Sequence, residues 1–466
     1  MEYSEIFKYK RFSTVIEEKI NKNLNNFLLR KDGQEELIFA LWTPSIGNNR
    51  YTAIINEIII PDDTDRNIHG NVSYNYQYLL RSCRLALERS CGLALLHSHL
   101  GPGWQGMSID DIETEKKTFI NAFSTTSFPF VGLTLGIDGY WSSRVWFYNK
   151  SNIINRKWAE AVRVNGLNYK IYFNDNVKPP IQANGKNIRT VNVWGEKVHK
   201  DITRLKIGIV GLGSVGSTVA EMLARMGLTD FTLIDFDIVE EHNLDRLCGV
   251  YESDIGKLKV DVIKRNIKKS STANKVKVEI DKNSLVKEIA YRKALDCDII
   301  FSCADRPRAR YLLNHIAYAH LIPVIDGGIL IEFDDEQNLN FADWSVHTVI
   351  PGRPCLKCLN AYQSSDVELE KQGKLDDTAY IQGLPDNHHL KSRENISPFS
   401  FNLASFEVLH FIVLTTGITE PEYYGEQKYR LKQGYLSRNY DLKCQSKCDF
   451  SNNVGIGDSI FELYES

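Results

Sequence analysis

Apolar runs and amphipathic stretches alternate along this 466-residue chain and separate it into two regions. In the first region, five short apolar runs have the length and bounding residues of strands, at 36–42, 53–60, 92–99, 130–137 and 143–148. Residues 74–90 and 110–123 repeat their apolar positions at helical spacing. The pattern predicts a mixed α/β domain over residues 1–174.

The second region alternates strand-like and helix-like segments more regularly. Its predicted strands lie at 206–213, 231–237, 298–305 and 322–329, and its clearest predicted helices at 217–227 and 309–321. Such alternation predicts βαβ units around a parallel sheet, so residues 188–466 are expected to form a doubly wound α/β domain. Residues 175–187, DNVKPPIQANGKN, break both patterns and are predicted to be a linker. The polar stretch 363–397 is expected to cross the surface.

The composition of the chain limits the classes of partner that we expect. With 56 basic and 59 acidic residues the formal net charge is -3, so no basic excess exists to attract nucleic acid or an anionic membrane. The N-terminal stretch lacks the apolar core of a signal peptide, and no unbroken apolar run approaches the roughly 20 residues of a membrane span. Nine cysteines, an odd number, favour a reducing compartment. We expect a cytoplasmic protein with neither nucleic acid nor a membrane as partner.

The stretch LALLHSHLGPGWQGMSIDD, residues 93–111, gathers polar groups at the end of a predicted strand. In a strand, residues i and i+2 face the same way, so His97 and His99 can point to one centre. Ser108 opens a helix that carries Asp111 one turn further on. Two imidazoles and a carboxylate would hold zinc with one position open, as a hydrolase needs. Alternatively, Ser108 is only a helix N-cap with Asp111 reciprocating.

This pattern resembles the motif of the JAMM (MPN⁺) metallopeptidases, in which His-x-His is followed by Ser-x-x-Asp. The resemblance, over roughly residues 30–150, implies a sheet domain like that of cytidine deaminases and a catalytic zinc on His97, His99 and Asp111. It implies that Ser108 helps to polarise the reacting carbonyl. The spacing from His99 to Ser108 is one residue longer than usual, which leaves Asp110 as an alternative ligand.

The same family uses a glutamate upstream of the histidines to activate the attacking water. Glu36, at the start of the predicted strand 36–42, is the expected counterpart. Its neighbour Glu35 and the more distant Glu57 are the alternatives.

A glycine-rich turn, KIGIVGLGSVGS, joins a predicted strand to a predicted helix in the second region. Gly211, Gly213 and Gly216 allow a tight turn and close approach of a phosphate to the helix N-terminus. Asp235 lies 19 residues beyond Gly216, where a ribose hydroxyl would bind. By itself this fingerprint also fits an NAD-dependent oxidoreductase.

The residues that follow resemble the ThiF-like and ubiquitin-activating adenylating enzymes, over roughly residues 188–466. These residues are Asn-Leu-x-Arg at 243–246, a lysine after Ile-Gly, and Asp305 five residues before an arginine. These residues would have no role in hydride transfer, so they do not fit an NAD-dependent oxidoreductase.

The resemblance implies ATP and Mg²⁺ as cofactors and a carboxylate that attacks the α-phosphate. Its implied site residues are Arg246 and Lys259 on the phosphates, Asp305 on Mg²⁺, Asp235 on the ribose, Asn243 near the phosphates, and Arg189 reaching the site of a second subunit. Positive charge on the phosphates is needed because negative charge builds up there during the transfer. A homodimer through this domain is therefore expected.

Four cysteines in two pairs, Cys355 and Cys358 with Cys444 and Cys448, resemble the structural zinc site of the same family. Four thiolates close the metal's coordination shell, so the implied role is folding. No cysteine lies between the two pairs, where ubiquitin-activating enzymes carry their nucleophile. Cys248, two residues after Arg246, is the remaining candidate for a thioester, although its interpretation as a small core residue is the stronger one.

Together the two resemblances indicate a bifunctional prokaryotic fusion that cleaves the tail of a ubiquitin-like protein and adenylates its C-terminal glycine. A conjugating enzyme or a sulfur donor would take the activated product. One alternative is a sulfur-carrier-activating enzyme of cofactor biosynthesis with a carrier-trimming peptidase. Another is a catalytically decayed scaffold that binds a ubiquitin-like protein. The sequence leaves the identity of that protein and the pathway open.

Overall fold

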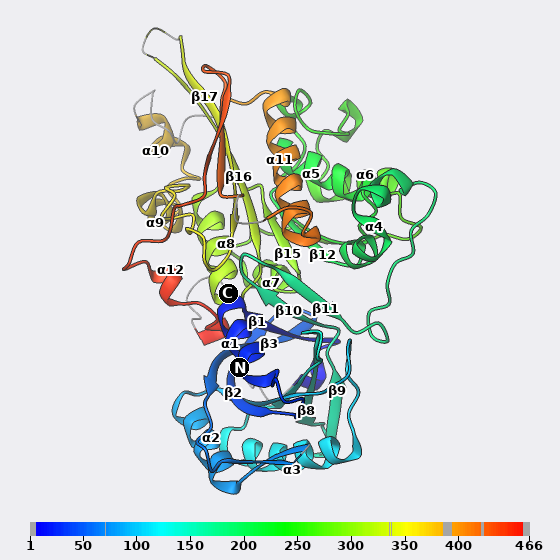
Figure 1. Ribbon diagram of the computed structural model, residues 1–466. Coiled ribbons are helices and arrows are strands. Elements are labelled where there is room, and N and C mark those ends of the chain that lie inside the picture. Colours follow the sequence, from blue (N-terminus) through cyan, green and yellow to red (C-terminus); the bar gives the residue numbers. More distant parts are fainter. Residues whose placement is uncertain are drawn as a thin grey trace. The chain divides into compact units, whose positions relative to one another are not determined.

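A computed structural model describes residues 6–69, 71–334, 336, 338–384, 394–420 and 424–459. The chain forms two compact units. The first comprises Met1–Pro180, Ala319–Leu321 and Asn453–Phe461, and the second comprises Ile181–Tyr318, Ile322–Asn452 and Glu462–Ser466. Each unit has its own sheet (Figure 1).

The first unit is built on a nine-stranded mixed sheet with the order β11-β10-β1-β3-β2-β6-β7-β8-β9. Its strands are β1 (Arg11–Glu17), β2 (Leu37–Ile46), β3 (Arg50–Ile59), β6 (Gly92–Ser98), β7 (Phe130–Leu135), β8 (Trp141–Tyr148), β9 (Ile154–Trp158), β10 (Ala161–Asn165) and β11 (Lys170–Phe173). A separate hairpin pairs β4 (Arg66–His69) with β5 (Asn71–Tyr74).

Both faces of this sheet are covered. Alternate residues of β2 belong to two cores: Ile38 and Trp42 pack with α1 (Glu18–Leu28) on one face, while Phe39 packs on the other. That second face is covered by α2 (Tyr76–Glu88) and α3 (Ile109–Thr126). Burial on both faces explains why β2 reads as a continuous apolar run instead of an alternating one.

The second unit has an eight-stranded sheet with the order β14-β13-β12-β15-β16-β17-β18-β19. The strands are β12 (Lys206–Val210), β13 (Asp230–Ile234), β14 (Lys277–Asp281), β15 (Ile299–Ser302), β16 (Val324–Phe333), β17 (Leu339–Val349), β18 (Glu426–Arg430) and β19 (Tyr435–Asn439). The first five are parallel and the last three add antiparallel pairs. Strand order reverses between β12 and β15, so these strands open a crevice at their carboxyl ends.

Helices flank this sheet, with α4, α5, α6 and α11 on one side and α8, α9 and α10 on the other (Figure 1). The helices are α4 (Ile188–Thr203), α5 (Ser214–Arg225), α6 (Lys259–Ser270), α7 (Glu288–Ala294), α8 (Pro307–Ala319), α9 (Ser364–Lys371), α10 (Thr378–Gly383), α11 (Ser397–Thr416) and α12 (Asp449–Asn452). The predicted surface crossover 363–397 contains α9 and α10, and its part 385–393 lies outside the described residues.

Helix α11 is the one helix among the described residues that is long and apolar enough to cross a membrane. It is not an unbroken apolar run, because Glu407 lies in its buried middle. The helix packs against α5, β16 and β17, which is how the core helix of a domain behaves.

The division of the chain differs from the predicted one at the C-terminus. Residues 188–466 were expected to form a single domain, yet Asn453–Phe461, like Ala319–Leu321, belongs to the first unit. The physical reason is hydrogen bonding to β2: Thr43 donates its hydroxyl to the Gly455 carbonyl (2.8 Å), and the Asp458 carboxylate accepts from the Ile46 amide (2.6 Å). Such long-range pairing leaves no signal in the local sequence pattern.

Candidate functional sites

Three of the predicted metal ligands lie together in the first unit. His97 and His99 follow each other on the same side of β6, and their Nε2 atoms are 3.1 Å apart. The carboxylate of Asp111, from the first turn of α3, lies 3.5 Å from Nε2 of His97 and 3.4 Å from Nε2 of His99. His97 is almost fully buried and the other two are partly exposed, so the cluster is open to solvent on one side.

Ser108 and Asp111 form a reciprocal capping box at the start of α3. The Ser108 hydroxyl accepts from the Asp111 amide (3.0 Å), and the Asp111 carboxylate accepts from the Ser108 amide (2.8 Å). The cap and the cluster therefore coexist, since the cap fixes the carboxylate that faces the histidines. Asp110 is exposed, which favours Asp111 as the ligand.

The spacing of these donor atoms fits zinc. Four donors in a tetrahedron, each about 2.0–2.2 Å from the metal, are separated by about 3.3–3.6 Å. The two separations that involve the carboxylate, 3.5 and 3.4 Å, fall in that range, and the one between the imidazoles, 3.1 Å, is slightly shorter. Three protein donors leave the fourth position for water or substrate.

The three groups of the cluster shift one another's pKa. Burial, assisted by the positive charge of Arg144, lowers the pKa of His97 to about 3, so its imidazole is neutral and can donate a lone pair. A hydrogen bond with Asp111 raises the pKa of His99. Burial alone would raise the pKa of Asp111, but its bonds with the histidines hold that pKa below its usual value.

Glu36, the predicted catalytic glutamate, does not face the two histidines. In the antiparallel pair β2–β6, Leu37 lies opposite His97. The Ser98 amide donates to the Glu36 carbonyl (3.0 Å), and the Glu36 amide donates to the Ser98 hydroxyl (3.0 Å). Side chains directly opposite one another share a face, so Glu36 lies on the side away from the histidines. There it is buried and bonded to Arg30 (3.1 Å) and Arg66 (2.7 Å). In this structure Glu36 therefore does not face the histidines, and its carboxylate serves as the partner of two arginines.

Glu35, the neighbouring alternative, faces the histidines instead. It precedes Glu36, so by the same alternation it shares the face of His99. Burial raises the pKa of its half-buried carboxyl, and the charges of His99 and Asp111 both act on it. Glu57 is exposed and lies opposite Leu41, away from the cluster.

In the second unit, the glycine-rich turn connects β12 to α5. Gly211 has a φ of 86°, and a Cβ there would lie 2.5 Å from the Cys303 carbonyl oxygen. A Cβ on Gly216 would lie 2.0 Å from the Gly211 carbonyl oxygen. No side chain fills the space at Gly213, the N-cap residue of α5. The turn therefore requires two of its glycines, and it leaves room beside the third at a helix N-terminus, where an anion is stabilised.

Asp235 follows β13 directly and is fixed beside the turn. Its carboxylate accepts the backbone amides of Leu212 (2.5 Å) and Asp237 (2.8 Å). Burial raises the pKa of Asp235 to about 6, against the opposing charge of Lys259. A carboxylate next to a phosphate turn is suited to accept a ribose hydroxyl.

Further predicted nucleotide residues follow β13 in the chain. The Lys259 ammonium donates to Asp237 (2.8 Å), which completes the Asp-Phe-Asp triplet begun by Asp235. Asn243 is buried and accepts the Glu240 amide (3.1 Å). Arg246 donates to Asp245 (2.9 Å).

Asp305 and Arg189 are both exposed. Asp305 follows β15, so it lies at the same sheet edge as the glycine turn after β12 and Asp235 after β13. Arg189 lies in the first turn of α4, and no hydrogen bond or ion pair within the described residues holds it. Arg310, five residues after Asp305, bonds to Asp326 (3.0 Å) and to the Gly327 and Ala361 carbonyls, which is a structural role.

The four paired cysteines also come together. The ligand atoms of Cys355, Cys358, Cys444 and Cys448 all lie within 4.8 Å of one another. Backbone amides donate to three of the sulfurs, for example from Cys355 to Cys444 (3.2 Å) and from Gln445 to Cys358 (3.4 Å). Amide-bonded thiolates that close a tetrahedron fit a structural zinc ion.

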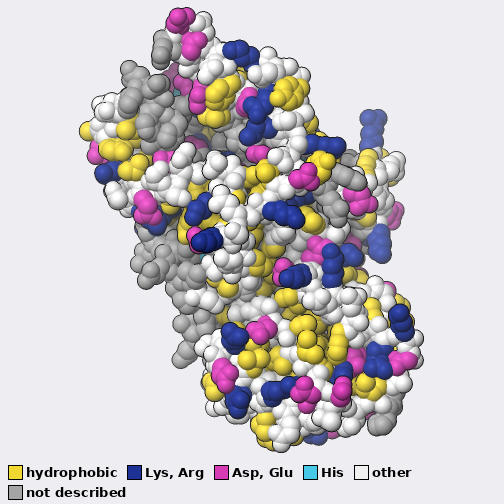
Figure 2. All heavy atoms as spheres, turned by 60° about the vertical axis from the view of Figure 1, so that its left-hand side comes forward, with side chains coloured by type: hydrophobic (Ala, Val, Ile, Leu, Met, Phe, Trp, Pro, Cys, Tyr) yellow, Lys and Arg dark blue, Asp and Glu magenta, His cyan; other side chains and the backbone are white. Residues whose placement is uncertain are grey.

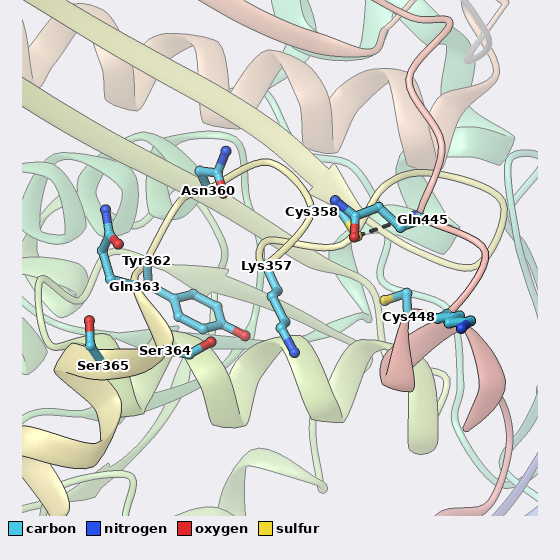
Figure 3. A pocket seen from close by; sticks show the side chains of 10 residues that line it. Lys357, Cys358, Asn360, Tyr362, Gln363, Ser364, Ser365, Gln445 and Cys448 are labelled. Atoms are coloured by element: carbon cyan, nitrogen blue, oxygen red, sulfur yellow. Dashed lines mark hydrogen bonds between the residues drawn. The ribbon is translucent and has the colours of Figure 1, made fainter.

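A polar pocket of about 400 Å³ lies beside this cysteine cluster (Figure 3). Its lining combines residues of the loop before α9 and of the first turn of α9 with residues near the second cysteine pair: Lys357, Cys358, Asn360, Tyr362, Gln363, Ser364, Ser365, Gln445, Lys447 and Cys448. None of the predicted nucleotide residues contributes to it. Two lysines beside a centre that would carry negative charge explain its composition electrostatically.

On the molecular face of Figure 2, acidic and basic side chains are interspersed. This distribution matches the near-zero net charge of the sequence.

The fold of the second unit and its sites define an α/β nucleotide-binding protein with a strand-end phosphate turn. The chain belongs to the ThiF family, whose model matches residues 185–446.

Curated relatives match parts of the same region. The SAMP-activating enzyme E1 of Haloferax volcanii is 26% identical over 157 residues, which cover 33% of this chain and 53% of the relative. The sulfur carrier protein ThiS adenylyltransferase of Bacillus subtilis is 28% identical over 232 residues, which cover 48% of this chain and 58% of the relative. The molybdopterin-synthase adenylyltransferase of Escherichia coli is 28% identical over 176 residues, which cover 37% of this chain and 64% of the relative. The chain thus spans between about half and two thirds of these relatives.

Among solved structures, E. coli MccB with MccA-N7isoASN aligns with a TM-score of 0.45 and 19% identity. The alignment covers 58% of this chain and 75% of that one.

Proposed function

We propose that the second unit adenylates the C-terminal glycine of a small ubiquitin-like or sulfur-carrier protein, using ATP and Mg²⁺. The observation that carries this proposal is the convergence of the glycine turn, Asp235 and Asp305 at the carboxyl ends of three neighbouring strands, in a chain of the ThiF family. The names of the relatives point the same way, since they describe enzymes that activate SAMP, adenylate ThiS or serve molybdopterin synthase.

Each residue has a defined task in this reaction. Lys259 leaves Asp237 to neutralise phosphate charge together with Arg246, and Asp235 accepts the ribose hydroxyl. Asp305, with its exposed carboxylate, is the ligand for Mg²⁺. Arg189, exposed on α4, is left for the site of a second copy, which makes a homodimer part of the proposal.

The acyl adenylate passes to a thiol or sulfide outside this chain. No cysteine follows Cys358 before Cys444, and burial raises the pKa of Cys248, which keeps it a protonated thiol and a poor nucleophile. A partner, either a conjugating enzyme or a sulfur donor, must therefore accept the acyl group.

Isotope exchange tests this activity. Labelled pyrophosphate should enter ATP only when a partner with a free C-terminal glycine is present, and Lys259→Ala or Asp305→Ala should lower the rate at least about 100-fold, because each removes charge stabilisation from the transferred group. Cys248→Ala, the control, should keep the wild-type rate. Binding of NADH with no exchange for any glycine-ended partner would instead support an oxidoreductase.

We propose a second activity for the first unit: metal-dependent hydrolysis of the peptide or isopeptide bond after the same carrier tail, as in a JAMM peptidase. The donor spacing of His97, His99 and Asp111 supports it. A zinc ion held there would polarise the scissile carbonyl and water. Glu35 then takes the proton from the attacking water, and Ser108 lies at the helix start beside the reacting carbonyl. A decayed scaffold would have no reason to keep this geometry.

Two adjacent substitutions separate the base from its neighbour. Glu35→Gln should lower hydrolysis of a carrier fused through its terminal glycine by about 100- to 10,000-fold, because proton transfer is lost. The zinc content should stay at the wild-type value. Glu36→Gln changes a buried partner of two arginines, so it should lower stability while the folded fraction still hydrolyses. Full activity of Glu35→Gln would refute the assignment.

A cytoplasmic location remains part of the proposal. All nine cysteines are free thiols, and the proposed zinc thiolates need reducing conditions to persist.

A further inference from the structure

A buried ion pair lies next to the cluster of His97, His99 and Asp111 in the first unit. The side chains of Glu115 and Arg144 are 1% and 0% exposed. The guanidinium of Arg144 holds both carboxylate oxygens of Glu115, through Nε at 3.0 Å and through its second terminal nitrogen. Trp146 donates its indole N–H to the same carboxylate (2.7 Å). The pair is thus fixed in one geometry.

The pair links the elements that carry the proposed ligands. Glu115 lies one helical turn after Asp111 on α3, so the two share a helix face. Arg144, on β8, donates a further hydrogen bond to the Thr134 hydroxyl on β7 (2.5 Å). Thr134 is the register partner of His97 in the parallel pair β6–β7, and its hydroxyl lies 3.4 Å from Nε2 of His97. A chain of contacts therefore runs from the helix of one ligand to the ring of another.

The sheet is shaped to admit this pair. A Cβ at Gly132 on β7 would lie 2.4 Å from the Glu115 carboxylate and 2.6 Å from Nε of Arg144. Only glycine allows the carboxylate to approach the strand so closely. The position of α3 over the sheet is therefore set by the pair and not by an apolar contact at this point.

Stability alone is a weak reason for such a pair. Removing two charges from water costs about as much as their attraction returns, and apolar replacements of buried ion pairs are often neutral or stabilising. Directionality is what a bidentate guanidinium–carboxylate contact adds. We propose that Glu115 and Arg144 are positioning residues that set the distance between Asp111 and His97 for a divalent metal. This inference rests on the proposed hydrolytic site.

The double variant Glu115→Met/Arg144→Met tests it, because it removes both charges at once and leaves no buried ion unpaired. Zinc affinity is measured on the full chain by competition with a chelator. Because the chain has two proposed zinc sites, Asp111→Asn identifies which zinc-binding transition belongs to this one. The double variant should melt within a few degrees of wild type yet bind this zinc about 10- to 100-fold more weakly, the usual effect of losing an outer-shell partner. The spectrum of bound Co²⁺ should change with it.

A matched control comes from the same unit. Asp65→Asn/Arg81→Met removes another ion pair of a largely buried carboxylate with no contact to the ligands, and it should leave zinc affinity unchanged. If the first double variant does not fold, Arg144→Lys keeps a charge beside Glu115 but loses the fork to Thr134, so it should still weaken zinc binding. Wild-type zinc affinity in either folded variant overturns the inference. If the wild-type protein shows no zinc-binding transition that Asp111→Asn removes, the proposed site itself is refuted.

Discussion

At the residue scale, we expect Asp235 to make ATP binding sensitive to pH. Burial raises its pKa to about 6, so the carboxylate is mostly ionised at pH 7 and gains a proton as pH falls through that value. A protonated carboxyl loses an acceptor that it needs for the two backbone amides and for the proposed ribose contact. The KM for ATP in pyrophosphate exchange should therefore rise about tenfold from pH 7 to pH 5.

Asp235→Asn provides the control for this effect. It has no titrating group, so its KM should be high at both pH values and change little between them. A wild-type KM that is constant over the same range would show that the ionisation of Asp235 does not govern nucleotide binding.

Which residues the sequence could predict depends on how local their geometry is. His97 with His99, and Ser108 with Asp111, were predicted as groups because strand alternation and one helical turn fix their directions, and the structure places them together. The choice between Glu35 and Glu36 depends on the register of β2 against β6, a pairing of distant segments. One residue of register exchanges the two faces, so adjacent carboxylates could not be distinguished.

At the element scale, the sequence predicted the most regular segments and missed others, among them β1, the 11-residue strand β17 and the 20-residue helix α11. The alternation in the second region gave the strands and helices around the phosphate turn, and the parallel sheet is present. Strands β9, β10 and β11 were not predicted, because their runs are only four or five residues long. The sequence carries no information on strand order, although the reversal between β12 and β15 is what creates the crevice.

The cysteine pairs illustrate the same limit between elements. The family resemblance suggested a shared site. The elements that bring the cysteines together, the loop after β17 and the segment before α12, are far apart in the chain, with 86 residues from Cys358 to Cys444. Sequence could name the ligands but not the amide donors around them. These donors belong to the same two loops and become visible only when the loops meet.

At the scale of the whole molecule, the first unit is completed by residues from the far end of the chain. Gly457 has a φ of 57°, and a Cβ on it would lie 2.2 Å from the Pro44 carbonyl oxygen, so this segment lies directly on β2. The Asp458 carboxylate accepts the buried Ile46 amide at 2.6 Å. A fragment cut at the linker, ending near residue 180, would lack this cover and would be a poor substitute for the full chain in metal and activity measurements.

Asp458→Ala tests this dependence in the full chain. Removing the carboxylate that accepts the buried Ile46 amide should cost about 1–3 kcal/mol of local stability, because this hydrogen bond no longer offsets the desolvation of the amide. Hydrogen–deuterium exchange in β2 should become faster, with little change in the parallel strands β12 and β13 of the second unit. Ser459→Ala is the matched control, since that exposed hydroxyl bonds only to the Ile456 carbonyl of its own turn. Equal exchange in β2 for both variants would mean that residues 453–459 rest on the first unit without stabilising it, and that the N-terminal unit could be studied alone.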